Sequence, residues 1–294
     1  MMEVSKLKKR PAYPFETIAV AIAFSPRLEA LLHEAKYYTE SFKANLVLLH
    51  VGEKDPKKEE ALDVLITNIG LPKSKTRTIW MDGEPTETIL NLCKLNIVDL
   101  LILGALEKEN LYKFYMGSIA RKVSRRAKCT VLLITNPSVS VKQNKIKKIV
   151  LNGVDNPKTV HTINTSVYFA KALKIKELTV VQEIDMPAIA LTIAENSTAP
   201  EASKIKKEMK DEEFAKINSI VEKIESNDLV INVKNVTGKP GYAISNYAKT
   251  KHYELLVINS PDTHLSIFDR IFTHDIEHIL ADLPCNLLIV HSRV

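Results

Sequence analysis

Cysteine is scarce in this chain of 294 residues, which has three, at positions 93, 129 and 285. An odd, sparse set without a CxxC pair predicts neither a disulfide framework nor a zinc site. Cys129 and Cys285 each precede an apolar, strand-like run. We therefore expect the cysteines to act as small buried hydrophobic side chains.

Long apolar runs are also missing. No stretch approaches the roughly 18 residues of a membrane span. The basic N-terminus, MMEVSKLKKRPAYPFE, is not followed by the apolar segment of a secretory signal. Both observations predict a cytoplasmic protein without a membrane partner. With 45% hydrophobic and 26% charged residues, the composition is that of a globular protein, and the length fits about two domains.

The net charge of +6 comes with three basic clusters, at 5–10, 121–128 and 142–148. Such clusters can attract an anionic partner, nucleic acid included. We favour solvated helix faces and a polar linker instead, because neither a nucleic-acid motif nor interleaved aromatic residues accompany the charge. Nucleic acid is therefore not an expected partner.

The sequence repeats itself. Residues 83–104 align with residues 238–259 at a shift of 155, and residues 127–135 align with residues 283–291 at a shift of 156. A period this long indicates a duplicated domain, not a solenoid. We predict domains over 1–140 and 145–294, joined by the polar segment 136–147.

Each copy alternates apolar runs with helical patterns, which predicts parallel α/β sheets with right-handed crossovers. The second copy differs by a long insertion over about 182–227, read as a loose loop at 182–203 followed by an amphipathic helix at 204–224. The expected strands are 17–23, 45–51, 76–81, 99–103 and 130–134, then 148–154, 177–181, 229–236, 254–258 and 286–290.

Several segments carry a family resemblance: AVAIAFSP after the first strand begins, LLHV closing the second, GEPTETI after the third, LILG followed by GS, and CTVLLI after a basic helix. The chain resembles a tandem universal stress protein. The resemblance implies two flavodoxin-like, Rossmann-like domains, each a five-stranded parallel sheet of order 3-2-1-4-5 with helices on both faces. Such domains often pair through their last strands, so 130–134 and 286–290 are expected to pair, making an internal pseudo-dimer.

The resemblance also implies a nucleotide site. Many relatives bind ATP through G-x2-G-x9-G-[S/T] after the fourth strand and an aspartate at the end of the first. The first copy keeps Gly104, Gly117 and Ser118, and Val51 at the end of the second strand completes the candidate site. Glu107 replaces the second glycine, where a carboxylate would repel a phosphate.

Other positions weaken the ATP prediction further. Ala23 stands where the aspartate is expected. In the second copy, the corresponding positions carry Asn259, Asp262 and Thr273-His274. Asp155 stands near the end of the first strand of this copy, in a register that the sequence leaves open. ATP binding is therefore possible but doubtful, and if a nucleotide binds, we expect it in the first copy.

Three further patterns have structural explanations beside functional ones. His274 and His278 are spaced i, i+4, as in a zinc site on a helix, but a polar helix start explains them as well. Ser25 is expected to cap a helix that begins at Pro26. His50 is expected to be half-buried, and Trp80 and Met81 are expected in the core or beside the pocket.

These observations predict a cytoplasmic stress-response protein that acts by ligand binding and protein association and not by catalysis. The alternative is a weak ATP-binding protein or ATPase using the first copy, although no general base or Mg²⁺-binding carboxylate can be identified. A third possibility is a regulatory module whose altered pockets bind another small ligand.

Overall fold

A computed structural model describes residues 13–108, 113–139, 146–185, 199–226, 228–260 and 270–291. Contacts divide the chain into two compact units. The first contains residues 1–146, 260–264 and 286–294, and the second contains residues 147–259 and 265–285. Within the described residues, no helix is both long and apolar enough to cross a bilayer.

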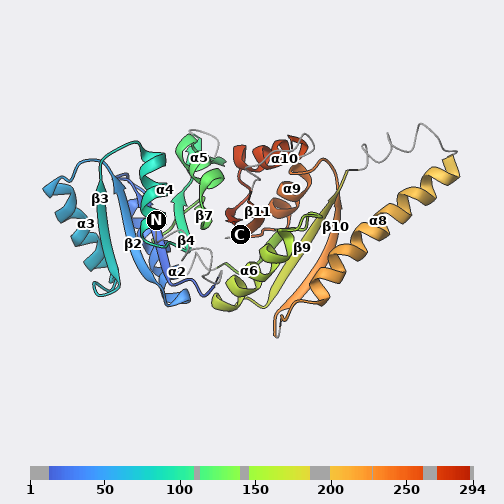
Figure 1. The fold of residues 1–294 in the computed structure, drawn as a ribbon, viewed down its shortest axis with the longest axis horizontal. Helices are drawn as coiled ribbons and strands as arrows, with labels where there is room; N and C mark the ends of the chain where they lie inside the picture. Colours follow the sequence, from blue (N-terminus) through green and yellow to red (C-terminus); the bar gives the residue numbers. More distant parts are fainter. Residues whose placement is uncertain are drawn as a thin grey trace. The chain divides into compact units, whose positions relative to one another are not determined.

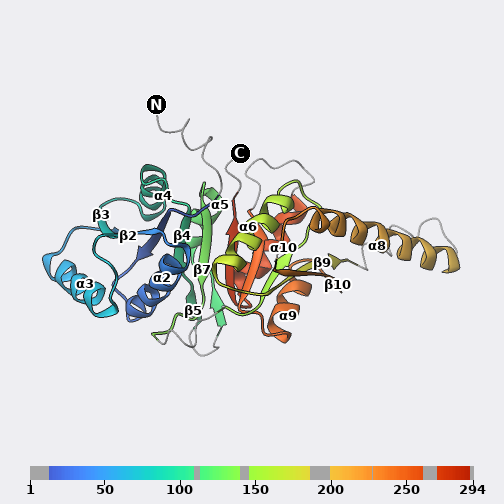
Figure 2. The same ribbon diagram turned by 90° about the horizontal axis from the view of Figure 1, so that it is seen from below.

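The first copy forms a parallel sheet in the order β3-β2-β1-β4-β7, which is the predicted order 3-2-1-4-5. Figure 2 shows α4 and α5 on one face of these strands and α2 and α3 on the other. The strands are β1 (Thr17–Ile22), β2 (Asn45–Val51), β3 (Thr76–Met81), β4 (Leu100–Gly104) and β7 (Thr130–Ile134). The helices are α2 (Leu28–Phe42), α3 (Pro56–Ile69), α4 (Pro85–Leu95) and α5 (Ser118–Arg126).

The second copy repeats the arrangement, with parallel strands in the order β10-β9-β8-β11. Figure 1 shows α9 and α10 on one side of these strands and α6 and α8 on the other. The strands are β8 (Ile149–Asn152), β9 (Glu177–Ile184), β10 (Val230–Thr237) and β11 (Leu255–Asn259). The helices are α6 (Thr159–Ala172), α8 (Ala199–Glu222), α9 (Tyr242–Thr250) and α10 (Arg270–Ala281).

The last strand of the chain, β12 (Asn286–Val290), pairs antiparallel with β7, and Leu288 lies opposite Leu132. The expected pairing of 130–134 with 286–290 is therefore present. Asn286 reinforces it, because its side-chain oxygen accepts hydrogen bonds from the backbone N–H and the hydroxyl of Thr135 at 2.9 and 3.0 Å. By sequence β12 is the fifth strand of the second copy, yet its contacts place it in the first compact unit.

A carboxylate bonds to the start of the first strand of each copy in the same way. Asp99, which is 1% exposed, accepts hydrogen bonds from the backbone N–H groups of Glu16 and Thr17 at 2.7 and 2.9 Å. Its repeat equivalent, Glu254, accepts from the N–H groups of Lys147 and Lys148. These N–H groups lie at or just before the first residue of the first strand of each copy, so both carboxylates fix where that strand begins.

Three local predictions need correction. The loop after β4 contains a two-stranded antiparallel hairpin, β5 (Leu106–Lys108) and β6 (Lys113–Tyr115). Helix α2 begins at Leu28 without a side-chain cap, so Ser25 is not its N-cap and Pro26 is not its first residue. The insertion also holds more regular structure than expected, since β9 runs to Ile184 and α8 begins at Ala199.

Candidate functional site

The candidate site of the first copy lies where its parallel strands end. Val51 closes β2, Gly104 closes β4, and Gly117 and Ser118 open α5. The order of the strands brings the carboxyl ends of β1 and β4 together, and ligands bind at such reversals in open α/β sheets. The first turn of α5 carries no acidic residue, so its unpaired N–H groups and helix dipole favour an anion.

Arg27, just before α2, spans part of this region. Its guanidinium donates hydrogen bonds to the carbonyl oxygens of Ala105 at 3.1 Å and Thr135 at 2.8 Å. These two residues directly follow β4 and β7. The ring of Phe114, in β6, lies 5.3 Å from the guanidinium carbon. Arg27 thus connects the loops that follow two neighbouring strands, and the hairpin covers it from one side.

Leu106 lies against the start of α5. A Cβ atom added to Gly117 would come within 2.7 Å of Leu106 Cδ1, the end of a flexible side chain, so a larger residue here would make Leu106 shift. Side chains alternate along a strand, which turns Glu107 to the opposite face from Leu106. Glu107 is exposed. The group closest to the potential anion site is therefore an apolar side chain, and the side chains of Lys108 and Lys113 lie outside the described residues.

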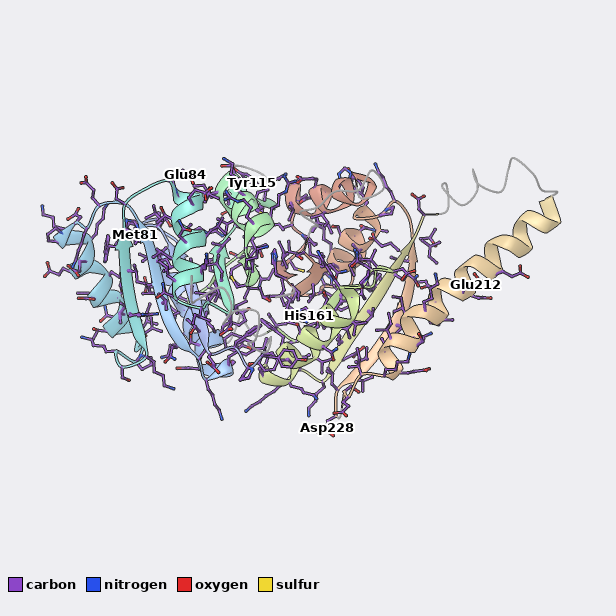
Figure 3. The ribbon with its side chains drawn as sticks, viewed as in Figure 1. Met81, Glu84, Tyr115, His161, Glu212 and Asp228 are labelled. Carbon is purple, nitrogen blue, oxygen red and sulfur yellow. The ribbon has the colours of Figure 1, made fainter. Side chains whose placement is uncertain are left out.

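Three rings pack together at the ends of β1, β2 and β3. Phe24 stacks on Trp80 with ring centroids 5.7 Å apart and meets the edge of His50 at 5.0 Å. His50 is 9% exposed, more buried than expected, and its Nδ1 donates to the carbonyl oxygen of Ile22 at 3.2 Å. Met81, the last residue of β3, is 40% exposed (Figure 3). The rings contact one another, but Trp80 is only half-buried and Met81 is exposed, so the expectation that they lie in the core is wrong.

In the second copy, side chains of β11 and α6 occupy the region that corresponds to the candidate site. Asn259, in the position of Gly104, accepts a hydrogen bond from the hydroxyl of Thr162 and donates one to Thr159 Oγ1 at 3.1 Å. Thr159 in turn donates to the carbonyl oxygen of Val154 at 2.6 Å. Asn259 is 8% exposed and both threonines are fully buried. A polar side chain thus joins β11 to α6 where a glycine would leave space.

The strand register settles the position of Asp155. Ile149 pairs with Leu255 in the second copy, as Ile18 pairs with Leu100 in the first, so Val154 corresponds to Ala23. Asp155 lies one residue further on and forms an exposed ion pair with Lys216 of α8 at 3.1 Å. Neither copy therefore carries an aspartate at this position. Asp262 lies outside the described residues, as does the side chain of Thr273.

The histidine pair lies in α10, as predicted, but only one side chain can be described. The ring of His278 packs against Tyr242, with centroids 4.2 Å apart, and the side chain of His274 lies outside the described residues. Among the residues that the structure describes, no cluster of three or more His, Cys, Asp or Glu side chains could hold a metal ion. Cys93 and Cys129 are buried, and the hydrogen bond that the Cys93 thiol donates to Cys129, together with burial, raises the pKa of Cys93.

Sequence reasoning missed Arg27 and Leu106. An arginine at a helix start carries no sequence signal for bonds to carbonyl groups 78 and 108 residues away. The hairpin had a weak signal, since Leu106–Lys108 and Lys113–Tyr115 mix apolar and charged residues over short runs. Treating this loop as a glycine motif concealed that signal.

Comparisons with known proteins agree with this geometry. Residues 57–135 match the model of the Universal stress protein family. The chain carries a universal stress protein domain. Universal stress protein YxiE from Bacillus subtilis is 27% identical over 146 residues, which cover 41% of this chain and 99% of that protein. Universal stress protein MJ0577 from Methanocaldococcus jannaschii is 24% identical and covers 45% of this chain and 97% of its own length.

Two solved structures match nearly the whole chain. A universal stress protein from Archaeoglobus fulgidus aligns with a TM-score of 0.62 at 14% identity, covering 96% of this chain and 98% of that one. A functionally unknown protein from Pseudomonas aeruginosa, PA1789, aligns with a TM-score of 0.68 at 15% identity, covering 98% and 95%. At such identities the likeness concerns the fold alone.

Proposed function

We propose that this universal stress protein acts by ligand binding and protein association in the cytoplasm, without catalysis, and that its first-copy nucleotide site is altered. The observation that carries the proposal is the placement of Arg27. Its guanidinium holds the carbonyl groups of Ala105 and Thr135 where the chain leaves β4 and β7. Two hydrogen bonds to a charged donor contribute roughly 1.5–3 kcal/mol each, so the bridge resists opening.

The side chains around the site support the same proposal. Leu106 lies against Gly117 and would have to move before a phosphate could reach the start of α5. Ala23 offers no hydrogen-bond acceptor for a ribose. In the second copy, Asn259 and Thr162 bond to each other in the corresponding region. Together these contacts favour weak ATP affinity in both copies.

Isothermal titration with Mg²⁺ and ATP tests the proposal. We expect the wild type to bind with a dissociation constant above about 1 mM, that is, with less than about 4 kcal/mol. The double variant Ala23→Asp, Glu107→Gly leaves the net charge unchanged. It removes the carboxylate from the loop after β4 and supplies a carboxylate at the end of β1 that can accept a hydrogen bond from a ribose. It should bind about 30- to 150-fold more tightly, or about 2–3 kcal/mol.

Glu212→Gln is the matched control, because Glu212 is an exposed carboxylate on α8 in the other unit (Figure 3). It should leave the titration unchanged. Micromolar ATP binding by the wild type would refute the altered-site proposal. If the double variant does not gain affinity, the repulsion and missing acceptor are not what weakens binding.

A second candidate function, a weak ATPase, is favoured by the retained Gly104, Gly117 and Ser118 and by the absence of acidic residues from the first turn of α5. It differs from the main proposal in one measurement. Release of inorganic phosphate from ATP by the wild type, lost in Gly117→Val, would support it. If the folded wild type releases no phosphate, the ATPase function is excluded and ligand binding without catalysis remains the proposal.

A further inference from the structure

A separate pocket opens in the second copy near the opposite, amino-terminal ends of its strands. It has a volume of about 270 Å³ and is lined by β9, β10, α9 and the segments beside them. Its lining residues are Lys148, Glu177, Thr179, Lys234, Tyr247, Lys251 and Tyr253. All of them belong to the second compact unit. The pocket is therefore distinct from any site at the carboxyl ends of the strands.

Hydrogen bonds hold the walls of this pocket in place. The hydroxyl of Tyr253 donates to Thr179 Oγ1 at 2.9 Å, and Thr179 is 1% exposed. The ring of Tyr247 lies beside that of Tyr253, with centroids 5.7 Å apart. Lys148 Nζ donates to the backbone carbonyl of Lys251 at 3.3 Å. Since these contacts come from several elements, Lys148 and the two tyrosines are positioned before any ligand arrives.

The first copy provides an internal comparison. By the strand registers and the repeat, Thr179, Tyr247 and Tyr253 correspond to Val47, Leu92 and Val98. These three residues are 1%, 2% and 4% exposed and belong to the core of the first copy. Lys234 likewise corresponds to Ile79. At these four positions the first copy has apolar side chains where the second has polar or charged ones. Lys148, Glu177 and Lys251 likewise replace the uncharged Thr17, Asn45 and Asn96. The charge of this corner is therefore particular to the second copy, which points to a ligand.

The charges indicate what kind of ligand fits. Three lysines and one glutamate line the pocket, a balance of +2, and the side-chain oxygen of Glu177 is already engaged by Asn232 Nδ2 at 2.7 Å. A dianion neutralises that charge. Lysine is a common phosphate ligand, because its ammonium is a compact charge with three donors. The volume admits a phosphate group with a few attached atoms, but not a whole nucleotide.

We propose that the pocket lined by Lys148, Lys234 and Lys251 binds a phosphate dianion, either free or as a small phosphate monoester. The ammonium groups supply the charge and the donors. The tyrosine rings form one wall, on which the organic part of a monoester would pack. This site would give the second copy a ligand of its own, independent of the first-copy loop.

Titration of the full chain with inorganic phosphate and with phenyl phosphate tests the proposal. At low salt, we expect dissociation constants below about 1 mM, rising steeply with NaCl because the contacts are ionic. Lys234→Gln and Lys251→Gln should each weaken binding about five- to tenfold. Lys223→Gln, an exposed lysine of the same unit outside the pocket, should leave it unchanged. The tighter-binding probe identifies whether free phosphate or a monoester is preferred.

Gly117→Val separates this site from the first copy. If Lys234→Gln and Lys251→Gln leave the affinity unchanged while Gly117→Val abolishes it, phosphate binds the first-copy loop and the proposal is wrong. Absence of binding by both probes at about 10 mM would also overturn it. All substituted lysines are exposed. Unchanged thermal unfolding should therefore accompany each lysine variant, so that a loss of affinity reports the pocket alone.

Discussion

Glu34 is a carboxyl group in a position that disfavours its charge. It lies on α2 and is 2% exposed, and burial raises its pKa to about 7. The backbone N–H of Ser138, just after β7, opposes the shift by bonding to it. Tyr37 and Tyr38 lie beside Glu34, and burial followed by the charge of Glu34 raises the pKa of both. Near neutral pH this residue is therefore close to its titration point.

The raised pKa predicts a pH-dependent stability. The folded state holds the Glu34 proton more tightly than the unfolded state, so this contribution is complete below pH 4.5 and is lost as the pH rises through about 7. Glu34→Gln should stabilise the protein at pH 8 by up to about 3 kcal/mol and have little effect at pH 4. Urea unfolding of both proteins at the two pH values measures this. Equal differences at both would show that Glu34 does not titrate in this range.

Asp99 allows a matched comparison between the copies. Asp99→Ala leaves the backbone N–H groups of Glu16 and Thr17 without their buried acceptor, which should cost about 2–4 kcal/mol. Glu254→Ala removes the equivalent acceptor of the second copy from a more exposed position and should cost less, about 1 kcal/mol. Urea unfolding followed by fluorescence of Trp80, which lies in the first unit, tests the larger effect. A smaller loss for Asp99→Ala than for Glu254→Ala would contradict the assignment.

The contacts of individual residues explain which parts of the candidate site could be predicted from the sequence and which could not. Gly104, Gly117 and Ser118 could be placed because strand ends and helix starts carry local signals. Arg27 could not, since its partners are carbonyl groups distant in sequence and any residue can supply a carbonyl. The position of Asp155 was ambiguous for a related reason: a register is fixed by pairing with neighbouring strands, and only the structure gives that pairing.

The β5–β6 hairpin is the element that most affects the candidate nucleotide site. It places Leu106 against Gly117 and Phe114 over Arg27. If steric cover limits anion binding, Leu106→Ala should tighten ATP binding about three- to tenfold, by exposing the start of α5. Leu106 is 50% exposed, so its truncation should cost little stability.

Glu107→Gln is the control for this element, because it changes only the charge on the opposite face of β5. If Glu107→Gln tightens ATP binding more than Leu106→Ala does, in the same titration with Mg²⁺, the main obstacle is electrostatic repulsion and not steric cover by Leu106.

The strands around the hairpin were predicted to within one or two residues in the first copy, because buried parallel strands read as continuous apolar runs. The hairpin itself is short and has no such run.

At the scale of the whole chain, the pairing of β7 with β12 gives the last prediction. All five residues of β7 are buried, and β12 supplies the antiparallel partner along one of its edges. Removing residues 286–294 would expose that edge, and an unpaired apolar edge strand pairs with another chain. The truncated protein should therefore form dimers through β7, with the same antiparallel geometry that the full chain satisfies internally.

Light scattering after gel filtration measures this directly, with the full-length chain as the reference at the same concentration. A second variant of the truncated chain, Thr135→Pro, removes a backbone N–H that faces the β12 side and donates to Asn286 in the full chain. It should weaken the dimer, because proline cannot donate a hydrogen bond to a newly paired strand. If the truncated chain stays folded and monomeric, the prediction is wrong. β7 would then not need a strand partner, and its pairing with β12 would not be the reason why two separate chains do not associate.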